Sequence, residues 1–237
     1  MAEAVKTQEP VGAEISAAAW SHALPFAAWM LLMVVLGSPA AWKYAVRSAV
    51  CFALFLGLRP WRWYAGLSVR HLAESFLCGV LVFVLWVGPE SAWMNGWPVL
   101  KSLYARWAFL PVGKVAAASP YAPETAGWTL AVIRLLGSAV VIAPIEEFFW
   151  RGFLYRWLLA KDFLVVSLST FRPGLFLLVA LAFGFEHDRW LAGLVAGLIY
   201  GALILRTRDI WAACVAHAIT NFLLGLYVLA TGAYGFW

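Results

Sequence analysis

Long apolar stretches separated by short basic clusters dominate this chain of 237 residues. An apolar run of about 20 residues crosses the ~30 Å hydrocarbon core of a bilayer as a helix, which satisfies its own backbone hydrogen bonds. The candidate runs are residues 20–37, 43–58, 72–89, 128–160, 173–187, 190–206 and 209–231. Hydrophobic residues make up 64% of the chain and charged residues 12%, whereas a soluble domain has about a quarter of its residues charged. The sequence therefore predicts an all-α, polytopic integral membrane bundle.

The number of transmembrane helices depends on residues 128–160, a run too long for one ordinary span. Its helix would extend about 50 Å at 1.5 Å per residue. Pro144 cannot donate a backbone hydrogen bond and disfavours helix at Ala143. A break there gives eight helices and a continuous run gives seven, and both counts stay open.

Composition also indicates the domain organisation. We expect a polar N-terminal tail over residues 1–19 and a single membrane domain over 20–237. The tail lacks the positive region that opens a secretory signal. Residues 90–127 contain several prolines and read as an extramembrane loop, within which WPVLKSLYARWAFL fits an amphipathic helix at the interface.

Basic residues indicate the orientation and the partners of the bundle. Three clusters fall between apolar runs: Arg59, Arg62 and Arg70; Arg151, Arg156, Lys161 and Arg172; Arg206 and Arg208. Placing all three in the cytoplasm puts the N-terminus inside, although Lys43 and Arg47 count against it. The net charge of +5 is thus explained by topology and contact with the lipid bilayer, with no nucleic-acid partner. The three cysteines lie far apart, which indicates neither a disulfide framework nor a zinc–thiolate site.

The segment EEFFWR places two carboxylates and an arginine after a long apolar run. Charged side chains at bilayer depth are costly and usually face a bundle interior or a water-filled cavity. Glu147 and Arg151 are four residues apart, the spacing of an ion pair on one helix face. Glu146 points about 100° away from Glu147 and is less neutralised, which suits a carboxylate that takes a proton from water. The alternative is a structural Glu–Arg clamp with Glu146 at the headgroups.

Two further motifs hold histidines. His187 ends the apolar run GLFLLVALAFGFEH, where it is either an interfacial histidine in a turn or a participant in catalysis. His217 and Asn221 in HAITN are four residues apart and share a helix face. They either hydrogen-bond between helices or direct an imidazole and a carboxamide at a developing oxyanion.

Taken together, EExxxR, FxxxH (Phe183 to His187) and HxxxN, in this order on separate apolar segments, resemble the CPBP family of intramembrane proteases. This family is also called the Abi or CAAX-protease group. The resemblance covers about residues 125–231. Within the family, the chain looks like the bacterial proteins labelled CAAX prenyl protease-related, which implies the bacterial inner (plasma) membrane.

The resemblance implies roles for individual residues. Glu146 and His187 would activate water, and His217 and Asn221 would stabilise the oxyanion. Glu147, Arg151 and Phe183 would support them. Metal dependence is disputed in the family, and Glu146, His187 and His217 together match a set of zinc ligands, although no HExxH is present. Zinc or another divalent metal is therefore an open alternative to a purely glutamate-dependent hydrolase.

The predicted function is hydrolysis of a peptide bond in a membrane-associated or lipidated protein or peptide by an intramembrane endopeptidase. An alternative from another class is a non-catalytic membrane scaffold that binds a sensor kinase or a protein-sorting partner. The two differ in their tolerance of changes at Glu146 and His187, which a scaffold would accept.

Overall fold

The computed structural model describes residues 11–110 and 120–237, and 82% of the structure is helical. Within these residues there is no β-strand, so the predicted all-α class is confirmed. Six helical runs are long and apolar enough to cross a membrane: Gly12–Val35, Ala41–Trp63, Val69–Glu90, Trp128–Leu159, Trp190–Thr207 and Ile210–Thr231. A seventh apolar helix, Pro173–Phe185, has only 13 residues. The chain is a polytopic membrane protein, whereas the predicted count of seven or eight spans is not confirmed.

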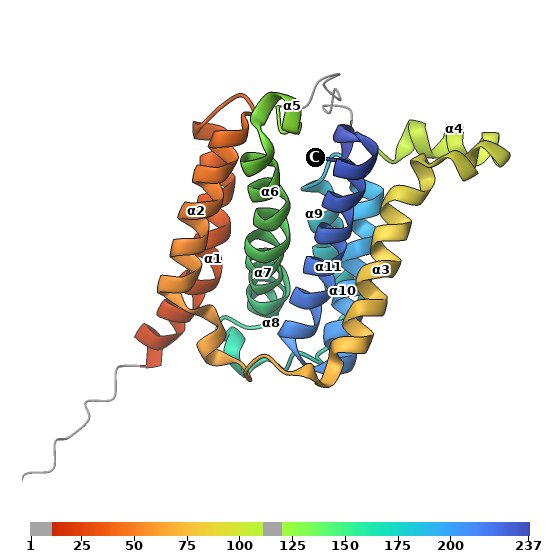
Figure 1. Cartoon of the computed structure of the whole chain (residues 1–237). Coiled ribbons are helices and arrows are strands. Elements are labelled where there is room, and N and C mark those ends of the chain that lie inside the picture. Colours follow the sequence, from red (N-terminus) through yellow and green to blue (C-terminus); the bar gives the residue numbers. More distant parts are fainter. Residues whose placement is uncertain (1–10, 111–119) are drawn as a thin grey trace, which may run out of the picture.

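Most of the bundle is built from α1 (Val11–Val35), α2 (Ala41–Leu58), α3 (Leu72–Val87), α9 (Pro173–Phe185), α10 (Trp190–Thr207) and α11 (Ile210–Thr231). Short 3-10 turns at Pro60–Trp63 and Val69–His71 connect α2 to α3. In Figure 1, α1 and α2 lie on one side of the molecule and α3, α10 and α11 on the other. The most extensive packing joins α10 to α9 and α11 to α3.

A long helix between these two groups carries the first motif. It runs from Trp128 to Leu159 and comprises α6 (Trp128–Leu136), α7 (Ala143–Glu147) and α8 (Tyr155–Leu159), joined by two π-helical segments (Figure 1). The π-helical segments are η5 (Gly137–Ile142) and η6 (Phe148–Leu154). The site residues of EEFFWR therefore begin in a single α-helical stretch with a wide turn on either side.

Of the two alternatives at Pro144, a break or a continuous run, the structure has the continuous run. The N–H of Ala143 donates to the carbonyl of Ser138, five residues earlier, so the turn that precedes the proline is a π turn. Local π adjustments of this kind let a membrane helix accommodate a proline without leaving backbone groups unsatisfied. The helix thus continues past Pro144, and the argument for an eighth helix falls away.

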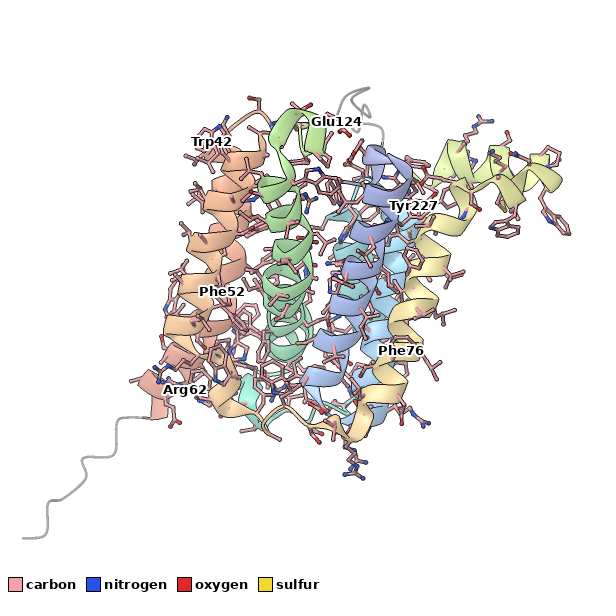
Figure 2. All side chains as sticks on the ribbon, viewed as in Figure 1. Trp42, Phe52, Arg62, Phe76, Glu124 and Tyr227 are labelled. Carbon is pink, nitrogen blue, oxygen red and sulfur yellow. The ribbon has the colours of Figure 1, made fainter. Side chains whose placement is uncertain are left out.

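The outer surface of the bundle is apolar at mid-height. Phe52 on α2 and Phe76 on α3 point outward and are 40% and 53% exposed (Figure 2). Arg62 and Glu124 lie at opposite ends of the bundle in the same view. Apolar side chains exposed between polar ends match the thickness of a bilayer and identify an integral membrane protein.

Two predicted boundaries differ from the structure or lie partly outside it. The first helix begins at Val11, before the expected start at residue 20, and residues 1–10 of the expected tail lie outside the described residues. The loop 90–127 contains α4 (Pro98–Trp107), which projects away from the bundle, and the short α5 (Pro123–Ala126) (Figure 1). Val99, Leu100 and Leu103 of α4 are exposed, as an interfacial helix requires. Residues 111–119 lie outside the described part.

Candidate active site

A cavity of about 390 Å³ lies inside the bundle and collects the predicted catalytic residues. Glu146, His187, His217 and Asn221 all line it, although they come from three segments far apart in the sequence. The remaining lining residues are Trp29, Met33, Tyr44, Arg47, Trp86, Arg134, Ser138, Ile142, Phe183, Glu186, Asp188, Arg189, Ala196, Tyr200, Thr220, Leu224, Gly235, Phe236 and Trp237. The three motifs therefore meet at one cavity that is large enough for a small ligand.

Two adjacent glutamates lie beside the two ring nitrogens of His217. Nδ1 of His217 donates to Oε1 of Glu147 at 3.0 Å, and Nε2 of His217 lies 3.8 Å from Oε2 of Glu146. The rotation of about 100° between neighbouring helix positions directs the two carboxylates to opposite sides of the ring. Both glutamates are buried, Glu146 being 5% exposed and Glu147 fully enclosed.

Glu147 is engaged by a second partner. The predicted i,i+4 ion pair is confirmed, because Nη1 of Arg151 donates to Oε1 of Glu147 at 3.0 Å. Arg151 also donates to the carbonyl of Gly197 at 3.3 Å and lies over the Phe183 ring at 4.2 Å. A buried charge needs such pairing and hydrogen bonding. Arg151 thereby couples the long helix to α9 and α10.

Glu146 has no comparable partner. Its Oε2 atom is buried and makes no hydrogen bond to the described residues, and 3.8 Å to His217 exceeds hydrogen-bond length. Oε2 of Glu147 is likewise unpartnered there, but Oε1 of Glu147 bonds to both Arg151 and His217. A buried polar atom without a partner in a native fold calls for an explanation such as a catalytic role or an unplaced water. The cavity adjoining Glu146 provides the space for water.

The His217 ring also packs against an aromatic residue of α10. Its ring stacks on Tyr200, with centroids 4.9 Å apart and planes inclined by 22°. The Tyr200 hydroxyl donates to Oγ1 of Thr220 at 2.7 Å, and Thr220 in turn donates to the carbonyl of Gly79 at 2.9 Å. The sequence analysis missed Tyr200 and Thr220. Thr220 lies inside HAITN, three residues after His217, and this position on the same helix face was the available signal.

His187 lies in the turn after α9 and is more remote from the carboxylates. Its Nδ1 donates to the carbonyl of Phe183 at 2.9 Å, and its ring packs against Trp86 at 5.3 Å. Burial lowers the pKa of His187 to about 4, so the imidazole is neutral near pH 7. Among the described residues no hydrogen bond joins it to Glu146 or His217. Both imidazoles instead contact the Phe183 ring, at 4.9 Å for His187 and 5.9 Å for His217.

Asn221 and Glu186 are two further polar residues that line the cavity. Nδ2 of Asn221 donates one hydrogen to the carbonyl of Ser138 at 3.0 Å, which leaves its second N–H for another acceptor. Glu186, to which the sequence analysis gave no role, accepts from the Trp150 indole at 3.0 Å. Burial raises the pKa of Glu186 to about 7.

The proposed metal ligands do not form a compact set. In residues 11–110 and 120–237, no three His, Cys, Asp or Glu side chains lie close enough to hold one ion. Glu146 and His217 are near each other, but Nδ1 of His187 donates to the carbonyl of Phe183, and both histidine rings contact the Phe183 ring. The side chains as arranged do not fit a three-ligand zinc site.

Residues 128–223 match the family model described as Type II CAAX prenyl endopeptidase Rce1-like. All three motifs fall inside this matched segment. This match covers less than half of the chain and supports a CPBP/CAAX-protease family assignment. No curated protein and no solved structure matches the chain significantly.

The matched family model describes a hydrolase of the CAAX-protease type. In the CPBP framework, the matched segment covers the long helix, α9, α10 and most of α11. Helices α1, α2 and α3 lie outside the match, yet Trp29, Tyr44 and Trp86 from these helices line the cavity. The part of the chain outside the match therefore shapes the surroundings of the family motifs.

Proposed function

We propose that this protein is an intramembrane endopeptidase in which Glu146 activates the attacking water. The supporting observation is the Glu146 carboxylate, which is buried, lacks a hydrogen bond on Oε2, and lines a cavity together with His217 and Asn221. Glu147 and Arg151 form the adjacent ion pair and hold His217 in place. Glu146 is thus the carboxylate that is free for acid–base catalysis, whereas the charge of Glu147 is neutralised by Arg151.

Hydrolysis begins with a water molecule in the cavity beside Glu146. The Glu146 carboxylate takes a proton from the water while its oxygen bonds to the carbonyl carbon of the substrate peptide. The carbonyl π electrons move to oxygen and form a tetrahedral oxyanion. As the oxyanion collapses, the C–N bond breaks, and Glu146 returns its proton to the leaving nitrogen. The products are a carboxylic acid and an amine, and Glu146 is again a carboxylate.

The oxyanion needs donors that are in place before the reaction. Asn221 supplies the N–H that Ser138 does not use. His217 supplies Nε2–H when its imidazole is doubly protonated, because Nδ1–H is already given to Glu147. In that state Glu146, Glu147, Arg151 and His217 carry two negative and two positive charges, which favours burial of the group.

His187 acts as a positioning residue in this proposal. With Nδ1–H donated to Phe183, its neutral ring presents Nε2 as an acceptor for water. His187, His217 and Glu146 line the same cavity, which gives a bound water room beside all three. His187 thus holds a water chain that supplies Glu146.

The substrate is a membrane-associated or lipidated peptide or protein, because a site within a membrane bundle excludes most soluble chains. We place the protein in the bacterial inner membrane with its N-terminus in the cytoplasm. The end of the bundle that carries Arg62 is then cytoplasmic, and the cavity extends toward the other end, where α2 begins (Figure 1). Reporter fusions before Val11 and within α4 test this orientation, since they should report opposite sides of the membrane.

The function is tested with purified protein in lipid nanodiscs and a mixture of labelled apolar peptides. Mass spectrometry should reveal new peptide termini with the unchanged protein and none with Glu146→Gln. The matched control is Glu14→Gln, which makes the same change at an exposed carboxylate of α1 and should cleave normally. Equal cleavage by Glu146→Gln would remove Glu146 from the mechanism. A chain that cleaves nothing would favour the scaffold.

A further inference from the structure

Two hydrogen bonds attach the end of α4 to the turn that follows His187. The N–H of Leu110 donates to the carbonyl of Asp188 at 2.9 Å. The indole N–H of Trp190 donates to the carbonyl of Trp107, the last residue of α4, at 2.6 Å. Asp188 and Trp190 follow directly after the histidine in the sequence, so the end of α4 contacts the turn that carries it.

A salt bridge attaches the beginning of the same loop. Arg189 donates from Nε and Nη2 to the two carboxylate oxygens of Glu90, at 2.5 Å and 2.9 Å. Two parallel N–H···O bonds fix the relative orientation of the two groups as well as their distance. Residues 90–110, which we call the α4 loop, are therefore tied to the His187 turn at both ends.

His187 depends on this turn for its position, because its side chain has few other restraints. In the described part of the chain, the imidazole makes one hydrogen bond, from Nδ1 to the carbonyl of Phe183. Its ring contacts are with Phe183 and Trp86. Trp86 lies four residues before Glu90, so a movement of the α4 loop would shift a ring that packs on the imidazole as well as the turn.

The apolar face of α4 is largely uncovered. At 100° per residue, Val99, Leu100, Leu103 and Trp107 fall within about 100° of one another, and all are more than half exposed. Ala105 lies on the opposite face. A contiguous apolar patch of this kind on the outside of a protein indicates a binding surface.

This face continues the membrane-facing surface of the bundle. Leu81 and Leu85 of α3 are exposed, and so are Trp93 and Trp97 between α3 and α4. In Figure 1, α4 runs outward from the end of α3 instead of along the bundle. An amphipathic helix in this position fits the headgroup region of a membrane, where tryptophans also gather. The partner that fits the face is therefore the surface of the bilayer around the bundle.

We propose that α4 binds the bilayer surface and thereby holds His187 in its working position, with Arg189 as a positioning residue. This inference rests on the function proposed above and adds a membrane contact on which that function depends. A bilayer that restrains α4 also restrains the turn, because the α4 loop is attached to the turn at both ends. The lipid surface is then part of the support of the active site.

Kinetics on the full-length protein in phosphatidylcholine nanodiscs test the bilayer contact. Leu103→Asp places a charge on the apolar face of α4 and should lower kcat about tenfold or more, since a misplacement of about 1 Å can cost ~100-fold. KM should stay nearly unchanged, because His187 orients water and not the peptide. Ala105→Asp introduces the same charge on the opposite, exposed face and should leave both parameters unchanged. An unchanged kcat in Leu103→Asp overturns the proposal.

The link through Arg189 is tested in the same assay. Arg189→Gln should lower kcat as Leu103→Asp does, and the reversed pair of Arg189→Glu with Glu90→Arg should regain part of the loss. The matched control is Arg206→Gln, which breaks a similar pair with Glu74 near the other end of α10 and should keep a normal kcat. Equal losses in Arg189→Gln and Arg206→Gln would contradict a positioning role for Arg189.

Histidine NMR separates this inference from the proposed protease activity. The chain has four histidines, so selective isotope labelling gives few resonances, and His187→Gln identifies the resonance of His187. This resonance should shift or broaden in Leu103→Asp and Arg189→Gln, while the other histidines stay in place and exclude general unfolding. A shifted resonance without any cleavage by the unchanged protein contradicts only the protease function. A resonance that does not move overturns the inference, whether or not peptide is cleaved.

Photo-crosslinking identifies what covers the apolar face of α4. A benzophenone amino acid in place of Leu103 should crosslink to phospholipid of the nanodisc. Crosslinking to a second copy of the chain or to the labelled peptide, in place of lipid, would overturn the bilayer as the partner.

Discussion

Nδ1 of His217 donates to Oε1 of Glu147 at 3.0 Å and joins two motifs that are 70 residues apart. The bond fixes the orientation of the imidazole and presents Nε2 toward Glu146. The two neighbouring glutamates therefore have different roles in the proposed mechanism. Glu147 orients the histidine, and Glu146 stays free for chemistry.

Substitutions of Glu147 and of Arg151 should have coupled effects on the free energy of unfolding. Arg151→Gln leaves Glu147 buried with His217 as its only hydrogen-bond partner, and breaking a buried pair typically costs about 3–5 kcal/mol. Glu147→Gln alone should also destabilise, but the double variant should lose less than the two single losses combined. Thermal unfolding in detergent measures the three variants, and simple additivity would show that the pair is not coupled.

Asn221→Ala should slow catalysis without weakening substrate binding. Removing one preorganised oxyanion donor lowers kcat by about 10²–10³, and a donor used only in the transition state leaves KM nearly unchanged. The lost hydrogen bond to Ser138 costs only about 1 kcal/mol of stability. Steady-state kinetics on the peptide identified by mass spectrometry measures both parameters. A raised KM with normal kcat would instead make Asn221 a substrate-binding residue.

Close packing of α9 on α10 should be required for the position of His187. A Cβ atom at Gly184 would lie 2.8 Å from the carbonyl oxygen of Trp190 and 2.9 Å from the backbone nitrogen of Leu194. Gly184→Ala therefore has to push the two helices apart and displace the turn that carries His187. We expect lower thermal stability and a loss of activity.

The same helix offers a matched control for this prediction. Gly174→Ala, near the start of α9, places its Cβ where no atom lies within 4 Å. It should retain both stability and activity. If Gly184→Ala behaves like Gly174→Ala, the helices tolerate separation and the contact does not hold His187.

Removal of divalent metals should leave peptide hydrolysis intact. The described acidic and histidine side chains form no three-ligand group, and the proposed chemistry needs only Glu146, His217 and Asn221 around the water. Elemental analysis of the purified protein and cleavage assays after chelator treatment check this expectation. Activity that disappears with the chelator and returns with zinc would instead support Glu146, His187 and His217 as ligands.

The sequence predicted the helical class from its apolar runs, whereas the set of site residues came from the resemblance of its three motifs to the CPBP family. It predicted the pairing of Glu147 with Arg151 because the spacing alone determines it. The sequence left a break at Pro144 open because local rules for proline take no account of a π turn ahead of it. The contact of Phe183 with both histidines depends on how α9 and α11 pack, which periodicity does not predict.

The position of Arg47 could not be predicted from the sequence either. In the sequence it only weakened an argument about orientation, since a basic residue near a helix start normally faces headgroups. The structure places it beside Arg134, which lies 87 positions later, on the wall of the cavity. No spacing rule connects two such distant residues.

The wide turns on either side of α7 carry an evolutionary implication. A π turn accommodates one residue more than the α-helix it interrupts, so losing a single codon from Gly137–Ile142 would convert the segment to ordinary α-helix and leave the flanking faces in nearly the same register. Such a protein should still insert into the bilayer, with Arg134 and Glu146 facing nearly as before. Gain or loss of one residue here is therefore a change that a descendant of this chain could tolerate, unlike the same change inside a regular helix.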